Sequence, residues 1–165
     1  MGEPAMVQES ARPHLKALSK LAADLNQASD RYTEELKAIE AELNSLNLGL
    51  ELTLSGPISE SDLQVNEWED YGELRSLTFY DCWYLAYGKH RGDWHLLVRK
   101  YRVTTDDSGK NTISEKAIET LLLLQASRDL RMASAGRILD LLAALQEEAK
   151  EKIAALKKVS DARKA

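Results

Sequence analysis

The sequence predicts an α+β fold, with an antiparallel β-meander of three to five strands between two long helices that pack antiparallel as a coiled-coil-like pair. Apolar residues recur every three or four positions near both ends of the chain, and they alternate with polar residues in between. A chain of 165 residues can bury one core without disulfides. We therefore expect a single domain over 1–165, with a helix over 14–47, a sheet region over 48–104 and a helix over 113–160.

The first helix is predicted by a stripe of apolar positions that step by three or four residues, with one polar member, Ser29. The stripe consists of Leu15, Leu18, Ala22, Leu25, Ser29, Tyr32, Leu36, Ile39, Leu43 and Leu46. This spacing is typical of a coiled-coil seam. Pro13 suits the first turn of such a helix, where its missing N–H is not needed.

The sheet region begins where the period changes to two. Alternating leucines at 48–54 predict a half-buried strand that ends at "SGP" over 55–57. The segment 58–73 shows no clear period: a short helix capped by Ser59 and an irregular strand with Val65, Trp68 and Tyr71 both fit it, and we expect it to be mostly loop. Aromatic and β-branched residues then predict strands over 74–87 and 94–104, followed by a turn-rich loop over 105–111.

The register of the hairpin around "KHRGDWH" (89–95) follows from parity. A loop with an even number of residues, either Gly92–Asp93 or His90–Asp93, gives one wholly apolar face. That face carries Trp83, Leu85, Tyr87, Trp94, Leu96 and Val98, while the opposite face carries the mixed set Cys82, Tyr84, Ala86, Gly88, His95, Leu97, Arg99 and Tyr101. An odd loop would mix the two sets, so the pattern favours an even one.

The last helix is predicted to begin near Thr112, which forms a capping box with Glu115, or at Ser114, whose neighbours Ile113 and Ile118 form a hydrophobic staple. Its apolar stripe continues to Val159, with a possible kink at Gly136. The stripe is wide before residue 145, which indicates burial against both the sheet and the first helix.

The predicted pairing of the two helices follows from their lengths. A helix of 34 residues is about 50 Å long, whereas a seven-residue strand covers about 23 Å, so half of the helix must extend beyond the sheet. An exposed leucine seam promotes aggregation and needs cover. We expect the last helix to provide it by running antiparallel to the first. A second copy of the chain could thicken this pair into a bundle, so a homodimer remains an open alternative.

Composition narrows the setting of the protein. One cysteine, Cys82, excludes an internal disulfide and fits a reducing compartment, so we expect a cytoplasmic protein. The longest apolar runs are far shorter than the ~20 residues of a membrane span, which argues against a membrane partner. The net charge of −5 argues against a nucleic-acid partner.

No pattern in the sequence predicts catalysis, a metal site or a cofactor. Arg91–Gly92–Asp93 suits a turn better than an adhesion motif, and His90 with His95 supplies only two metal ligands where zinc takes four. Cys82 and His95 should lie about 20 Å apart along the sheet, too far for a nucleophile and its base.

The leading hypothesis is a non-enzymatic protein–protein interaction or adaptor module, whose helices pair or oligomerise and whose sheet face and charged hairpin bind a protein partner. The expected partner-binding residues are Tyr84, Lys89, Arg91, His95, Arg99, Tyr101 and Arg128. One alternative is a small-ligand-binding protein or small enzyme, with a pocket between the acidic loop over 67–73, Tyr84, His95 and Arg128. Another is a nucleic-acid-associated regulator that uses the basic segment 89–102.

Overall fold

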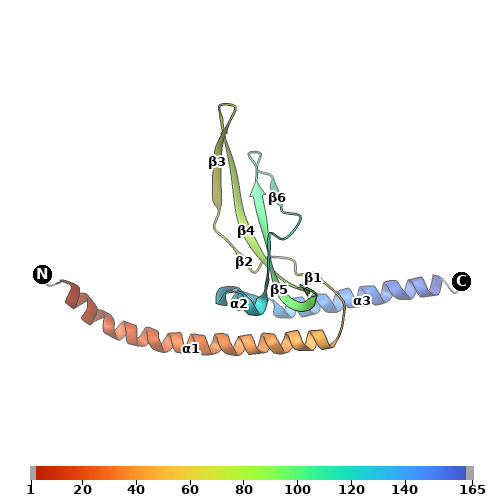
Figure 1. Cartoon of the computed structure of the whole chain (residues 1–165), viewed down its shortest axis with the longest axis horizontal. Coiled ribbons are helices and arrows are strands. Elements are labelled where there is room, and N and C mark those ends of the chain that lie inside the picture. Colours follow the sequence, from red (N-terminus) through yellow and green to blue (C-terminus); the bar gives the residue numbers. More distant parts are fainter. Residues whose placement is uncertain (1–2, 163–165) are drawn as a thin grey trace.

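The computed structural model describes residues 3–162, with side chains described from residue 9 onward, and within this range the chain is α+β. An antiparallel seven-stranded sheet stands on a base of helices (Figure 1). The elements are α1 (Glu3–Ser45), β1 (Leu52–Thr53), β2 (Ser59–Glu60), β3 (Gln64–Asp70), β4 (Glu73–His90), β5 (Asp93–Thr105), β6 (Asn111–Ile113), β7 (Glu119–Leu122), a 3-10 helix η1 (Leu123–Gln125), α2 (Arg128–Ser134) and α3 (Ile138–Ala162).

The centre of the sheet is the hairpin of β4 and β5. Its two-residue turn, Arg91–Gly92, pairs Tyr87 with Leu96 and Leu85 with Val98, which confirms the even loop and the apolar face. Both turn residues have positive φ, 53° and 101°, as a tight hairpin turn of this kind requires. The turn lies one residue earlier than Gly92–Asp93, so His95 pairs with Gly88 rather than with His90.

The two edges of this hairpin are covered by interrupted strands, which is why the sheet has more strands than predicted. β1, β2 and β3 pair in succession with β4, and β6 and β7 pair with β5. Across the first interruption, the amide of Ile58 still donates to the carbonyl of Trp83 (2.7 Å), and across the second Ile118 donates to Lys100 (2.8 Å). The chain therefore follows the predicted meander, with each outer strand broken into pieces.

Two predictions about secondary structure were wrong. Segment 58–73 is not mostly loop, because β2 and β3 occupy much of it. The helix predicted from 113 does not form until Arg128, because residues 119–122 pair with the open edge of β5. A leucine run can be a buried strand or a buried helix, and periodicity alone does not separate the two. Ser127, rather than Thr112 or Ser114, caps the first helix of this region by accepting from the Leu130 amide (3.3 Å).

The helices also differ in their bounds. α1 begins well before residue 14, so Pro13 lies inside the helix rather than in its first turn. It ends at Ser45, two residues before the predicted bound, and Asn47 just beyond it has a φ of 48°, the left-handed conformation that terminates helices. Near Gly136 the last helical region divides into α2 and α3, in agreement with the expected kink.

The core lies between the apolar face of the β4–β5 hairpin and the helices. Leu36 and Leu43 of α1 contribute to it together with Leu85, Leu96 and Leu123. From α3 come Ile138, Leu141 and Leu145. The middle and the end of α1 are thus held against the body of the protein.

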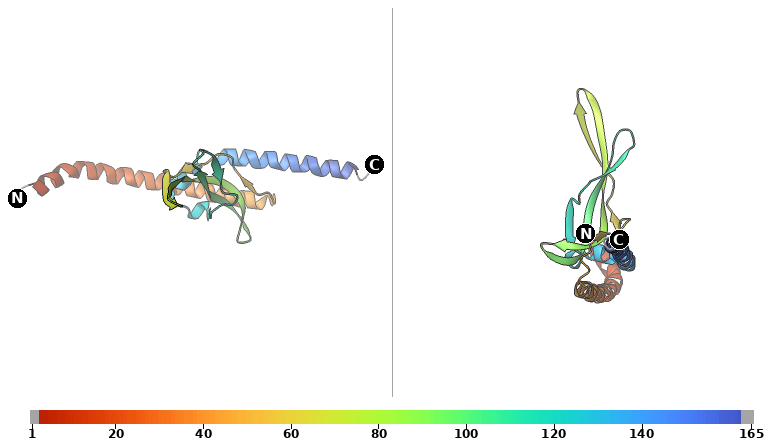
Figure 2. Two further views of the ribbon diagram at one scale, coloured as in Figure 1. Left: turned by 90° about the horizontal axis from the view of Figure 1, so that it is seen from above. Right: turned by 90° about the vertical axis from the view of Figure 1, so that its right-hand side faces the viewer.

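The predicted antiparallel pairing of two long helices is not found within residues 3–162. α1 and α3 run in the same direction and extend from opposite ends of the body (Figures 1 and 2). The physical reason is that residues 113–127 form strands and connections, so that α3 begins beneath the sheet rather than beside the end of α1. None of the helices within residues 3–162 has the uncharged apolar length that a lipid bilayer requires.

Candidate interaction surfaces

The residues predicted to bind a partner do not form one surface. Tyr84 and Tyr101 come together on the mixed face of β4 and β5, with ring centroids 5.4 Å apart in an edge-on contact. They line a shallow pocket of about 330 Å³. Arg99, on the same face, is engaged by Glu51 and donates to Thr53 Oγ1 (2.7 Å). Its guanidinium therefore ties β1 and the segment before it to β5.

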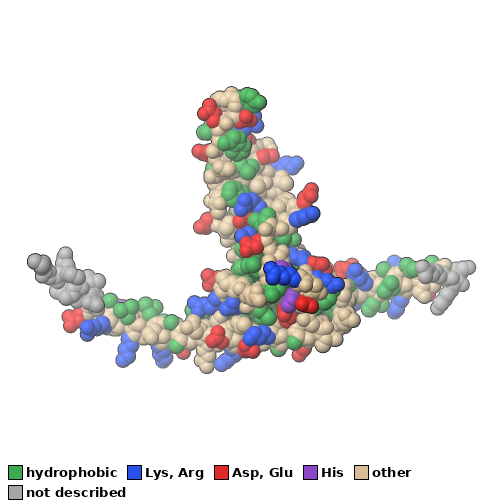
Figure 3. Space-filling model, in the orientation of Figure 1, with side chains coloured by type: hydrophobic (Ala, Val, Ile, Leu, Met, Phe, Trp, Pro, Cys, Tyr) green, Lys and Arg blue, Asp and Glu red, His purple; other side chains and the backbone are tan. Residues whose placement is uncertain are grey.

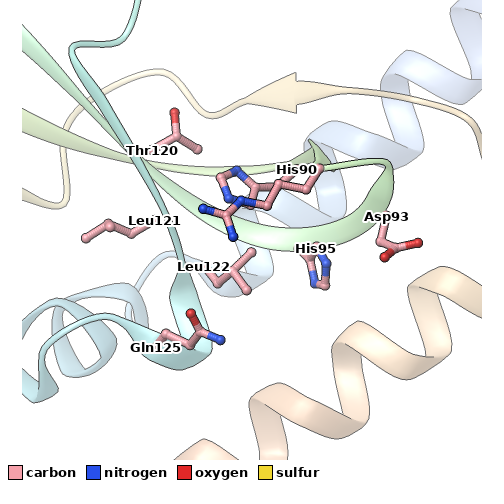
Figure 4. Close-up of a pocket in the computed structure, with 8 residues that line it drawn as sticks. His90, Asp93, His95, Thr120, Leu121, Leu122 and Gln125 are labelled. Atoms are coloured by element: carbon pink, nitrogen blue, oxygen red, sulfur yellow. The ribbon is translucent and has the colours of Figure 1, made fainter.

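A second pocket, of about 360 Å³, lies beside the turn of the hairpin. His90, Arg91 and His95 line it from the hairpin, and Gln125 does so from η1 (Figure 4). His95 Nδ1 lies 3.2 Å from Glu40 Oε1, and the other oxygen of Glu40 accepts from the Leu96 amide (2.7 Å). His95 thus serves to hold α1 on β5. Within residues 3–162 no group of three or more His, Cys, Asp or Glu side chains is arranged to hold a metal ion.

Lys89 and Arg128 lie elsewhere. Lys89 is on the apolar side of the hairpin, with its Nζ 5.5 Å from the centroid of the Trp94 ring. That ring stacks on Tyr87 (5.4 Å), whose hydroxyl donates to Asn44 Oδ1 (2.8 Å). Arg128 donates to Asn26 Oδ1 of α1 (2.6 Å). Arg128 therefore fastens α2 to α1, whereas the described contact of Lys89 is with Trp94 within the hairpin.

The ligand pocket considered between the acidic segment 67–73, Tyr84, His95 and Arg128 is not assembled by these residues. The acidic residues lie on the far part of the β3–β4 hairpin, which points away from the helices (Figure 1). His95 and Arg128, by contrast, both contact α1. The two groups are at different ends of the molecule.

The most exposed apolar surface of the sheet is the part of the β3–β4 hairpin over residues 64–78, here called the projecting hairpin. Tyr71 at its turn is 100% exposed, and Val65, Trp68 and Leu74 are also exposed. Four acidic residues, Glu67, Glu69, Asp70 and Glu73, stand among them with one basic residue, Arg75. Figure 3 shows hydrophobic and acidic side chains together at its free end. Sequence reasoning missed this element because its apolar residues lie on both faces, although "YG" was a readable turn signal.

The base of the projecting hairpin is held by charged side chains. Arg102 donates to both carboxylate oxygens of Asp81, at 2.8 and 3.1 Å, and its guanidinium carbon lies 4.3 Å from the centroid of the Phe79 ring. The hydrogen bonds from Arg102 are the main reason that the pKa of Asp81 lies below its ordinary value. Lys100, two residues before Arg102 in β5, forms an ion pair with Glu119 (Nζ to Oε2, 2.6 Å), and its Nζ lies 4.8 Å from the centroid of the Trp83 ring.

A second exposed apolar surface follows the two helices beyond the body. In α1 it includes Leu15, Leu18, Leu21 and Leu25, and in α3 it includes Ile153, Leu156 and Val159.

Comparisons with protein-family models, with curated proteins and with solved structures gave no match. The exposed surfaces themselves are therefore the guide to function.

Proposed function

We propose that this chain is a non-enzymatic protein-binding module that presents the projecting hairpin to a partner protein. The observation that carries the proposal is the exposure of Trp68 and Tyr71 on a hairpin that extends beyond the helices. Trp and Tyr are enriched among the few residues that dominate binding energy at protein interfaces. A two-stranded hairpin has little stability of its own in water, so a partner surface that covers its apolar residues would also stabilise it.

The charge of the projecting hairpin favours a basic partner. Residues 64–78 hold four acidic side chains and one basic one, a balance of −3. Asp70 lies 3.4 Å from Arg75, which leaves Glu67, Glu69 and Glu73 without an ion pair at this distance among the described contacts. Complementary charge accelerates encounter and rejects partners of like sign. The partner is therefore a protein with an apolar recess bordered by Lys or Arg side chains.

The base of the hairpin supports this role because it fixes the direction in which the hairpin points. The Asp81–Arg102 pair and the contact of Arg102 with Phe79 lie where β4 leaves β5 to continue with β3 alone. A binding element held in one orientation loses less conformational entropy on association.

A peptide selection tests the proposal, because it needs only the chain itself as bait. Random displayed peptides are selected on the immobilised chain, and the recovered peptides are then measured against Trp68→Ala with Tyr71→Ser. We expect peptides that combine Lys or Arg with large apolar residues, and at least a ten-fold loss of affinity for the double variant. Asp107→Ala, at the turn between β5 and β6, is the matched control and should bind normally. Peptides that are acidic, or that bind the double variant equally well, contradict the proposal.

A further inference from the structure

The apolar stripe of α1 continues from the core into a part of the helix where its leucines are exposed. Within the body, Ser29, Leu36 and Leu43 are buried. Leu25 and Leu18 lie on the same stripe, one and two heptads before Tyr32, and both are about half exposed. Lys16, Lys20 and Asp24 lie on another side of the helix, since they follow each other at intervals of four out of phase with the leucines. We call residues 9–28 the α1 overhang.

α3 repeats this arrangement at the other end of the molecule. Ile138, Leu141 and Leu145 are buried, and the stripe then continues through Ile153 to Leu156, which is 70% exposed. We call residues 149–162 the α3 overhang. Beside it, Leu46, Leu48 and Leu50 form an apolar groove of about 370 Å³ together with Ile153 and Leu156. This groove offers a seat for an amphipathic helix.

We infer that two copies of this chain associate so that the α1 overhang of each packs antiparallel on the α3 overhang of the other. The two overhangs project from opposite ends of the body, and the helices α1 and α3 run in the same N-to-C direction (Figures 1 and 2). A two-fold axis perpendicular to the helices reverses one copy. It thereby places α1 of each copy alongside α3 of its partner, once at each end, which is the self-complementary contact expected of a symmetric dimer.

The dimensions of the overhangs agree with this arrangement. At 1.5 Å per residue the α1 overhang is about 30 Å long and the α3 overhang about 21 Å. The overhangs of each copy carry seven apolar side chains that are about half exposed or more: Leu15, Leu18, Leu21, Leu25, Ile153, Leu156 and Val159. If each of the fourteen side chains in the dimer buries about 100 Å² of apolar surface, the interface reaches about 1,400 Å², which is the size of a stable protein interface.

A second copy is the occupant that the geometry favours over an unrelated partner. Another protein would have to supply two separate apolar helices, spaced by the full length of the body, to cover both overhangs. A second copy supplies both by symmetry. The dimer does not depend on what the projecting hairpin binds, because that hairpin extends from the opposite side of the body from the helices (Figure 1).

Disulfide mapping tests the inference at residue level. Leu18→Cys is mixed, after joint refolding, with Ile153→Cys, Leu156→Cys or Val159→Cys in a chain that carries a tag of different size, and each mixture is oxidised. We expect one of the three mixtures to form the mixed dimer at least ten-fold faster than Leu18→Cys forms a dimer with itself. Cys82 is buried, so the parent chain should form no cross-link. Lys20→Cys, on the outer side of α1, is the matched control and should also form none.

The other outcomes contradict the inference. A dominant disulfide between two Leu18→Cys chains would show that the α1 overhangs pair with each other instead. Equal cross-linking by Lys20→Cys would mean that the collisions are non-specific, and the absence of any cross-link would mean that the two overhangs do not meet.

Discussion

Leu15 and Leu36 lie on the same stripe of α1, three heptads apart, yet Leu36 is fully buried whereas Leu15 is 58% exposed. The helix thus carries one continuous seam, half of which is covered by its own chain. Helices in proteins gain most of their stability from the packing of an amphipathic face against neighbouring elements. The exposed half of the seam therefore needs a neighbouring helix, and the dimer provides it.

The two ends of this seam should respond differently to the same truncation. Leu36→Ala removes a fully buried side chain and should lower the free energy of unfolding by about 2–5 kcal/mol at any protein concentration. Leu15→Ala should act mainly through association, so its effect should shrink as the chain is diluted. Urea denaturation at several protein concentrations measures both. A large, concentration-independent effect of Leu15→Ala would show that the chain covers this residue itself.

A buried polar contact holds α2 on α1. Ser134 Oγ donates to the Arg131 carbonyl (2.6 Å), so the Tyr32 hydroxyl must be the donor in its 3.0 Å contact with Ser134 Oγ. Burial is the main reason that the pKa of Tyr32 lies above its ordinary value. Tyr32→Phe should lower the free energy of unfolding by about 1 kcal/mol. Tyr71→Phe, at the exposed turn, is the control and should leave it unchanged. Equal effects of the two variants would refute the role of this hydrogen bond.

The Asp81–Arg102 pair should make stability depend on acid pH. The pKa of Asp81 is lower in the folded chain than in the unfolded one, so its contribution is present above the unfolded pKa of about 4. It is lost as pH falls through the lower folded pKa. Asp81→Asn should reduce the free energy of unfolding by about 1 kcal/mol at neutral pH, and the difference from wild type should vanish in strong acid. Thermal unfolding over pH 2–7 measures this, and a difference that does not change with pH would contradict it.

Cys82 should be chemically inert in the folded chain. It is 2% exposed, and burial is the first cause of a thiol pKa above the ordinary value, followed by the nearby charges of Glu60 and Asp81. Because only the thiolate reacts with disulfide reagents, we expect Cys82 to be labelled at least 100-fold more slowly than the exposed thiol of Lys20→Cys. Similar rates for the two would mean that β4 opens readily around residue 82.

Much of the fold follows from short-range patterns in the sequence. The seam of α1 predicted a long helix, and the alternation around Trp83 and Trp94 predicted which residues share the apolar face of the central hairpin. Leu121 and Leu122 were assigned to a helix because a leucine run fits either structure. The free edge of β5, which is distant in sequence, determines that they form a strand.

The candidate surfaces were harder to predict than the fold. Lys89 and Arg99 were predicted to bind a partner, and in the structure Lys89 lies over Trp94 while Arg99 contacts Glu51 and Thr53. Tyr71 looked like a loop residue and instead stands at the tip of the projecting hairpin. The leucine seam indicated that cover was needed, but whether that cover comes from the same chain or another depends on where α3 starts.

The molar mass of the chain in solution, measured by light scattering during size-exclusion chromatography, tests the dimer most directly. We expect twice the 18.5 kDa of one chain for the wild type and for Lys20→Glu. Leu18→Glu places a charge on the covered side of α1 and should return the mass to that of one chain. A wild-type mass of one chain at micromolar concentration, or a Leu18→Glu variant that keeps the doubled mass, would contradict the proposed association of the overhangs.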